Sequence, residues 1–269
     1  MTINTNLQAL QGADNLNAAQ QRLDQSLQRL SSGLQINSPA DDPAGLAAAT
    51  NLSAEVQRTT AAESNVSTAL SFTQTQDGYL SGISTALSQM SQLSVEAMND
   101  TVSDSDRSLY DLEFQQLSSY ITATAAKDFD GVSLFSGSSI GVTLDADNAM
   151  TMSMNGVDLT TGAYAAATSS DIGTTVSAGA AMAAVQQAIT QLASDRATIG
   201  SYETRLNYAA NQLSVAQQNL TSASSEIEDV NVADESTTYA TDNILVQSAT
   251  AMLAQANQLP ATVLKLITG

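Results

Sequence analysis

The sequence predicts a mainly α fold, an elongated antiparallel helical rod or coiled coil that carries a small β-rich tip. Three observations predict it. Apolar residues recur at seven-residue spacing in the C-terminal third, a shorter leucine ladder lies near the N-terminus, and residues 129–180 between them are rich in Gly, Ser, Thr and Asp. A seven-residue seam needs a partner helix along its length. We therefore expect the chain to run out as helices, turn in its middle and return.

The first ladder belongs to an expected helix over residues 180–230. Its main row, which we expect to pack the rod, is Leu192, Ile199, Leu206, Leu213, Leu220 and Ile227. A helix over residues 184–230 would be about 70 Å long, whereas a compact chain of this size would measure only about 48 Å across. Because this helix is longer than a compact chain is wide, we expect an extended molecule.

The two ends of the chain carry further apolar ladders. The C-terminal ladder is Leu245, Ala249, Met252, Ala256, Leu259, Val263 and Leu266, and a second row beside it is Val246, Leu253, Pro260 and Ile267. The N-terminal ladder is Leu16, Leu23, Leu27, Leu30 and Leu34. The C-terminal face is wider than a two-helix seam requires. We expect the terminal helices to pair with each other and then with other copies; the alternative is an ordinary bundle that closes on its own termini.

The N-terminal half divides into three expected helices. The first covers about residues 7–35 and ends before the Ser38–Pro43 break. Asp42 before Pro43 predicts an N-cap with proline at the first helical position, opening a helix to about residue 98 in which Gly78 or Gly82 could mark a kink.

The third helix is expected to run to about Lys127. Ser103 and Asp106 have the spacing of a capping pair at its start. Its packed face is predicted to hold Leu109, Leu112, Gln116 and Tyr120 or Ile121.

The middle of the chain is expected to form short strands. They are predicted at residues 142–144, 150–154 and 157–159, with Asn155-Gly156 as a hairpin turn. The run Asp145-Ala146-Asp147-Asn148 lacks the glycine and glutamate of an EF-hand loop and is interpreted as a solvated turn.

Composition excludes several classes of function. The net charge of −19, from 27 acidic and 8 basic residues, opposes binding to nucleic acid or to an anionic membrane. Cysteine and histidine are both absent, which removes thiolate nucleophiles, imidazole bases and the usual zinc ligands, so we expect no enzyme, metal or cofactor. The N-terminus has no basic region followed by an apolar core, and composition alone would place the protein in the cytoplasm.

Motifs at both ends resemble those of bacterial flagellins. The N-terminal set is Ile3–Asn6, Arg29–Ser38 and Asp41–Gly45; the C-terminal set is Ser225–Asp229, Val246–Ala249, Leu253–Pro260 and Val263-Leu264; and Phe129-Asp130-Gly131-Val132 is similar to the family's Phe-Asn-Gly motif. The resemblance covers roughly residues 1–135 and 180–269, in the order that the family has them.

The resemblance implies a two-layered structural subunit of the flagellar filament, of a short type with a reduced outer region. An inner coiled coil would comprise residues 1–37 and 231–269, a rod residues 38–135 and 180–230, and a tip residues 136–179. It also implies secretion through the flagellar type III export channel, an extracellular place in the filament, and swimming motility. Implied partners are other copies, the filament cap, hook-associated proteins and an export chaperone that covers the C-terminal helix.

Some positions depart from the family pattern, and other functions stay open. Gln35 and Gln89 stand where flagellins commonly have arginine, and the segment around Gln89 and Leu93 resembles one that an innate immune receptor recognises; we expect weak recognition. A hook-filament junction protein has the same layout and is the nearest alternative. A surface glycan-binding adhesin is another, although the tip offers only Tyr164 and a few aspartates.

Overall fold

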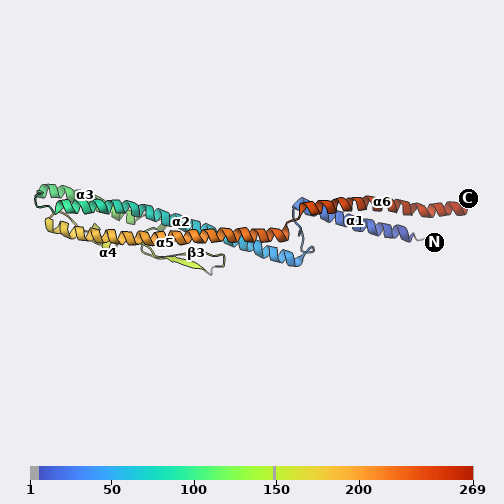
Figure 1. Cartoon of the computed structure of the whole chain (residues 1–269), viewed down its shortest axis with the longest axis horizontal. Helices are drawn as coiled ribbons and strands as arrows, with labels where there is room; N and C mark the ends of the chain where they lie inside the picture. The colour runs from blue at the N-terminus through green and yellow to red at the C-terminus, as the bar shows by residue number, and fades with distance from the viewer. Residues whose placement is uncertain (1–5, 148–149, 269) are drawn as a thin grey trace. The chain divides into compact units, whose positions relative to one another are not determined.

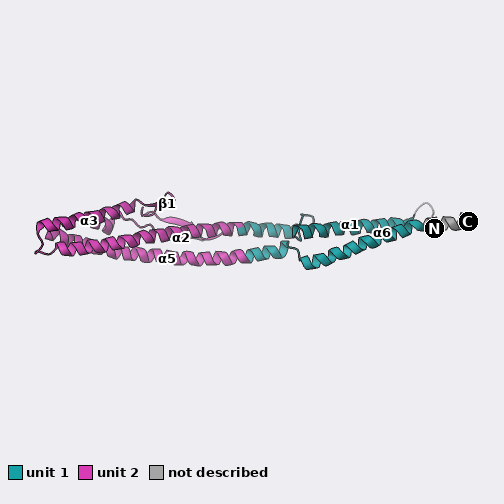
Figure 2. Ribbon diagram, turned by 90° about the horizontal axis from the view of Figure 1, so that it is seen from above, with its two compact units in different colours: residues 1–56, 219–269 teal, residues 57–218 magenta. Residues whose placement is uncertain are grey.

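The computed structural model describes residues 6–147 and 150–268, with side chains described up to residue 258. Its elements in chain order are α1 (Leu7–Ser32), α2 (Pro43–Ala97), α3 (Asp104–Ala125), β1 (Asp128–Phe129), β2 (Val132–Ser133), β3 (Ile140–Thr143), β4 (Thr151–Met154), α4 (Gly162–Thr168), α5 (Thr175–Glu228) and α6 (Val232–Thr268). The expected mainly α fold with a small β part is confirmed. Two compact units divide the chain, one of residues 1–56 and 219–269 and the other of residues 57–218 (Figure 2).

The first unit is built on α1 and α6, which lie side by side and antiparallel (Figure 1). The start of α1 meets the later part of α6, where the Asn6 side-chain amide donates to the Ala256 carbonyl oxygen at 2.8 Å. The last turns of α1 meet the start of α6, where Arg29 lies 3.9 Å from Glu235. The two contacts fix both the direction and the register of the pair.

Gly33 ends α1 earlier than the leucine ladder predicts. Its φ of 77° is left-handed, and its N–H donates to the Arg29 carbonyl oxygen, which closes the last turn. Leu34 therefore leaves the helix and forms a β-bridge with Asp229 in the connector between α5 and α6. The prediction that Leu34 continues the helical ladder is wrong, because the glycine cap precedes it.

The entry into α2 follows the predicted capping. The Asp42 carboxylate accepts from the backbone N–H groups of Ala44 and Gly45, both at 3.0 Å, and Pro43 is the first helical residue. Asp41 accepts from the Ser38 N–H at 2.9 Å and from the Gln25 amide at 3.0 Å. The Ser38 hydrogen bond, more than any other contact, holds the pKa of Asp41 below its ordinary value.

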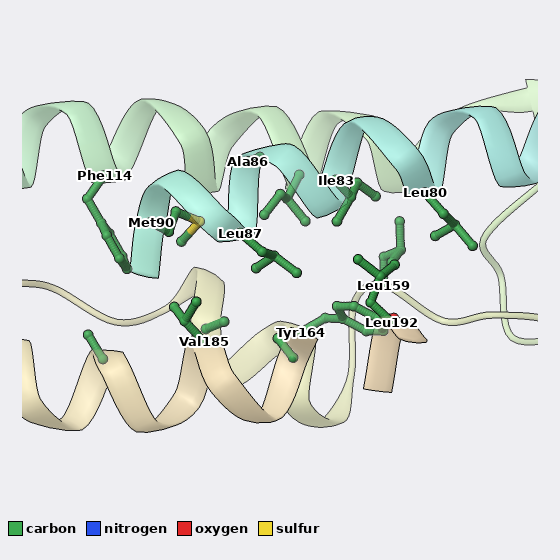
Figure 3. Close-up of a cluster of buried hydrophobic side chains, with 14 of the residues drawn as sticks. Leu80, Ile83, Ala86, Leu87, Met90, Phe114, Leu159, Tyr164, Val185 and Leu192 are labelled. Atoms are coloured by element: carbon green, nitrogen blue, oxygen red, sulfur yellow. The ribbon is translucent and has the colours of Figure 1, made fainter. Parts of the chain in front are cut away.

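The second unit holds the large apolar core, in which α2, α3, α4 and α5 meet (Figure 3). Leu80, Leu87 and Met90 from α2 lie fully buried, and Phe114 of α3 is as fully enclosed. Gly78 and Gly82 interrupt nothing, since α2 runs unbroken through both. A Cβ at Gly82 would lie 2.7 Å from the Tyr120 hydroxyl, the far end of a half-exposed side chain of α3.

The third helix begins as predicted but packs on another face. Ser103 accepts from the Asp106 N–H at 3.2 Å and donates to its carboxylate at 2.7 Å. Leu109 and Leu112, predicted as core residues, are 61% and 62% exposed. Ile121, one of the predicted alternatives, is buried, and the other buried residues of α3 are Arg107, Phe114, Ser118 and Thr124.

The β elements form two separate hairpins. Asp130 and Gly131, at φ 51° and 78°, make the two-residue turn between β1 and β2. Strands β3 and β4 pair antiparallel with Val142 opposite Met152. The expected Asn155-Gly156 hairpin turn is wrong.

Tertiary contacts explain that difference. The Asn155 N–H donates to the Tyr202 hydroxyl of α5 at 3.1 Å, and Gly156 lies against the backbone of Ser138, where a Cβ would clash. Residues 157–159 consequently form no hairpin with β4, and Asp158 makes a bridge to Ser136 instead. Beyond them lies α4, a short helix that the sequence did not indicate.

Candidate assembly surface

The C-terminal helix α6 has two neighbouring apolar rows, of which α1 covers one. Val246 and Leu253 lie partly buried in the α1–α6 seam, and a Cβ built at Gly12 would lie 3.5 Å from the Leu253 side chain. Leu245 and Met252, one residue earlier in each turn, are 42% and 69% exposed. Successive helical residues are rotated by about 100°, so the second row stands beside the seam rather than behind it.

The seam itself buries small or polar side chains. Among the described residues of α1 and α6, the fully buried ones are Ala19, Ser26, Glu235 and Asp242. Large apolar side chains on the same two helices stay in solvent: Leu7, Leu10, Leu27, Ile244, Leu245 and Met252. The helix pair thus leaves much of its apolar surface uncovered within one chain.

The predicted terminal ladder residues take different places. Leu16, Leu23 and Leu30 are partly buried beside α6, while Leu27 is half exposed. Leu245 and Met252 are exposed beside the seam. The seam with α1 runs instead through Val246 and Leu253, the second row of the C-terminal face. Leu259, Val263 and Leu266 lie outside the residues whose side chains are described.

The residues predicted to pack the rod lie along one row of α5. Leu192, Ile199, Leu206 and Leu213 are buried, and Leu220 and Ile227 are partly buried. A bidentate pair between Arg196 and Asp77, with N–O distances of 2.7 and 3.0 Å, joins α5 to α2 beside that row. Hydrogen bonding to Asp77 raises the pKa of Arg196.

The segment that resembles a receptor-binding site, residues 89–95, is partly enclosed. Gln89, Gln92 and Val95 are exposed, but Met90 is fully buried and Leu93 is only 7% exposed in the core of the second unit. The side chains of Met90 and Leu93 therefore contribute to packing between helices.

A polar layer crosses the α1–α6 seam, and sequence analysis missed it. The Ser26 hydroxyl donates to Glu235 Oε1, and Arg29 Nη1 lies 3.9 Å from Glu235 Oε2. Arg29 Nε is buried without a hydrogen-bond partner among the described residues. The sequence does contain a signal for this layer. Glu235 and Asp242 lie at seven-residue spacing in the same row as Ala249 and Ala256, so both acids could have been placed on the packed face of α6.

Within residues 6–147 and 150–258, acidic side chains form no cluster of three that could hold a metal ion. Asp147, from the acidic turn, lies 3.6 Å from Arg58 instead. Over the searched part of the chain, the helices lack an apolar stretch long enough to cross a bilayer.

Comparisons with known proteins agree with the arrangement of the helices. Residues 3–140 match the bacterial flagellin N-terminal helical region, and residues 182–267 match the bacterial flagellin C-terminal helical region. The flagellar filament 33 kDa core protein of Treponema phagedenis is 32% identical over 99% of this chain and 100% of its own. A flagellin of Halalkalibacterium halodurans is also 32% identical, with the same coverage.

Two solved structures are similar in fold. The crystal structure of Bacillus cereus flagellin aligns with 56% of this chain and 88% of its own, at 26% identity and a TM-score of 0.51. A putative flagellar hook-associated protein from Vibrio parahaemolyticus aligns with 70% of this chain and 100% of its own, at a TM-score of 0.61 but only 19% identity, which shows a common fold alone.

Proposed function

The chain belongs to the bacterial flagellin family, and from that premise we propose that it assembles into the flagellar filament through the uncovered apolar rows of α1 and α6. As a flagellin it is a structural subunit that is exported to form the extracellular filament for motility, by polymerising with copies of itself. The proposal adds the residues through which the copies meet, and it gives the chain a structural role with no catalysis.

The distribution of apolar side chains on the α1–α6 pair carries this proposal. Ordering a residue costs roughly 1–2 kcal/mol of backbone entropy, while burying a leucine or methionine returns about 1.5–3 kcal/mol. A seam that encloses Ala19 and Ser26 while leaving Leu10, Leu245 and Met252 in solvent offsets little of that cost. Neighbouring copies would supply the missing apolar contacts, so that folding of the ends and polymerisation become one coupled event.

The terminal apolar ladders and three segments of the chain would have different places in the filament. Contacts with neighbouring copies would involve the exposed Leu27, Leu245 and Met252, together with Leu259, Val263 and Leu266, while Leu16, Leu23 and Leu30 would pack the inner coiled coil beside α6. Residues 1–37 and 231–269 would form the inner coiled coil, residues 38–135 and 180–230 the rod, and residues 136–179 the outer tip. Leu192, Ile199, Leu206, Leu213, Leu220 and Ile227 would hold the rod together.

Further partners follow from the same apolar helix. Before export, the outer row of α6 would be an aggregation hazard in the cytoplasm. We propose that an export chaperone covers α6, and that the filament cap and hook-associated proteins meet the chain during assembly. The junction-protein and adhesin alternatives are not favoured, because the near-full-length relatives are flagellins and a filament core protein.

The test compares assembly of three purified proteins by sedimentation and negative-stain electron microscopy, with added filament seeds. They are the full chain, a truncation to residues 40–230, and a full-length variant with Leu7, Leu10, Leu245 and Met252 changed to Gln. We expect filaments from the full chain alone. A full-length control with Leu109 and Leu112 changed to Gln should still assemble, because those leucines are equally exposed but lie on α3.

Filaments from the quadruple terminal variant would contradict the proposed surface. Soluble, folded monomers from every protein under every seeding condition would contradict polymerisation through the termini altogether and would favour a bundle closed on itself.

A further inference from the structure

Two acidic side chains are buried between α1 and α6. Glu235 and Asp242 of α6 are 8% and 5% exposed. A buried carboxylate is costly unless a cation or hydrogen-bond donors compensate it. Glu235 accepts a hydrogen bond from the Ser26 hydroxyl of α1 and forms an ion pair with the Arg29 guanidinium of the same helix.

The same charge pattern repeats one heptad further along both helices. Asp242 follows Glu235 by seven residues, and Arg22 precedes Arg29 by seven. In an antiparallel pair, one heptad forward on α6 corresponds to one heptad back on α1. Arg22 therefore occupies the position on α1 that corresponds to Asp242, but its side chain is exposed, and the two residues form no ion pair within 4.0 Å in the described part of the chain.

We infer that the polar layer of Ser26, Arg29 and Glu235, with the second buried acid Asp242 one heptad away, sets the register of α1 against α6. The inference rests on the proposed function, since this register decides which apolar residues of α1 stand beside which apolar residues of α6 on the surface that neighbouring copies meet. These are positioning residues of assembly, and they act through the helices that they align.

The apolar part of the seam cannot fix the register by itself. Leu16, Leu23 and Leu30 repeat every seven residues, as do Val246 and Leu253. A slip of one heptad would replace leucine by leucine, at little cost in contact.

The polar layer distinguishes the slipped registers. One slip would place Arg22 and Ala19 opposite Glu235 and so remove the Ser26 hydroxyl; the opposite slip would place Arg29 at Asp242 and leave Glu235 beyond the end of α1. Either slip takes from Glu235 a partner that it has in the present register, and a buried carboxylate that loses a partner is costly.

The imperfect hydrogen bonding of the layer favours a role in specificity over one in stability. Arg29 Nε has no acceptor among the described residues, so the layer stabilises the helices less than matched apolar side chains would. A single buried polar layer is known to fix register in coiled coils at a cost in stability.

Disulfide trapping tests the register, since the chain has no cysteine of its own. The native-register reporter is Gly12→Cys with Leu253→Cys, because a Cβ at Gly12 would lie 3.9 Å from Leu253 Cβ, within the range of a disulfide. The slipped reporter is Ala19→Cys with Leu253→Cys, one heptad away. Both are oxidised as full-length soluble chains and as sedimented filaments, and intramolecular products are separated on non-reducing gels.

We expect the native reporter to cross-link at least tenfold more than the slipped one in the parent sequence. Adding Glu235→Gln and Asp242→Asn should bring this ratio close to one. The matched control adds Asp14→Asn and Asp24→Asn, which change the net charge equally at exposed positions of α1 and should leave the ratio unchanged.

Three outcomes would overturn the inference: equal cross-linking of both reporters in the parent, a tenfold ratio that survives loss of the two buried acids, or an equal fall in the control. If circular dichroism shows that the buried-acid variant loses helix, a charge exchange decides. Glu235→Arg should then reduce the ratio, and Arg29→Glu combined with it should restore it; failure to restore it counts against the inference. If the parent chain forms no filaments, the proposed function fails separately, while the soluble chains still report the register.

Discussion

Met252 offers the sharpest test of the outer row of α6. Its side chain is 69% exposed within one chain, whereas its neighbour Leu253 packs on Gly12. Alanine has the highest helix propensity, so Met252→Ala should keep α6 intact while removing most of the apolar surface offered to another copy. The folded chain before assembly should be nearly unaffected.

The expected magnitude follows from the exposed fraction. Full burial of a methionine contributes about 1.5–3 kcal/mol, so burying the exposed 69% would contribute about 1–2 kcal/mol per copy. Since about 1.4 kcal/mol corresponds to a factor of ten, the critical concentration for polymerisation should rise by about 5- to 27-fold.

The assay measures the protein that remains soluble after seeded polymerisation at several total concentrations. Val176→Ala is the control, because Val176 is 83% exposed but lies at the start of α5. Its critical concentration should stay within about twofold of the parent, as surface substitutions usually change free energies by no more than about 0.5 kcal/mol. An unchanged critical concentration for Met252→Ala, or an equal rise for the control, would refute the reasoning.

Four further predictions concern the second unit. Phe114→Ala should lower the free energy of unfolding by about 3–5 kcal/mol in urea, because the ring is fully buried, while Leu112→Ala at an exposed site should cost far less. Ser103→Ala should cost about 1 kcal/mol by removing the α3 cap, as measured by thermal unfolding. Burial, with the Asp77 charge nearby, raises the pKa of Glu203, so its contribution to stability falls as pH rises through that pKa; Glu203→Gln should therefore raise the melting temperature at pH 7 and leave it unchanged well below pH 4. The innate immune receptor for flagellins should respond weakly to this chain, because the exposed Gln89 stands where flagellins commonly have arginine and Leu93 is enclosed in the core. Strong nanomolar activation in a reporter-cell assay would contradict this.

Long-period patterns predicted most of the helical architecture. The seven-residue row from Leu192 to Leu213 is buried along α5, and the Asp42 and Ser103 caps start their helices where expected. These signals are local or periodic, so they are visible in the sequence without knowledge of tertiary neighbours.

The buried face of α3 could not be chosen from the sequence. Leu109 and Leu112 give a plausible apolar stripe, yet Phe114 and Ile121 face the core. Arg107 shares the buried face because its guanidinium donates to the Ala97 and Asn99 carbonyl oxygens at the end of α2. Contacts between distant segments decide this choice, and periodicity within one helix does not contain them.

The same limit applies to the assembly surface. The sequence indicated that the apolar face of α6 is wider than one seam, and the structure has two rows there. Which row α1 occupies could not be predicted, because Leu245 and Val246 are adjacent and both apolar. Glu235 and Asp242 are buried as well, and acidic side chains are rarely expected inside a seam.

The two units differ in how they satisfy their apolar residues. The second unit encloses Phe114, Leu87, Met90 and Leu206 among its own helices, which can stabilise it within a single chain. The residues that the first unit buries between α1 and α6 are an alanine, a serine and two carboxylates, and several of its large apolar side chains remain exposed. A chain of this kind can keep one part folded while the ends acquire most of their stability only from neighbouring copies. Assembly would then be controlled at the ends, where burial depends on other subunits, and would leave the core of the second unit unchanged.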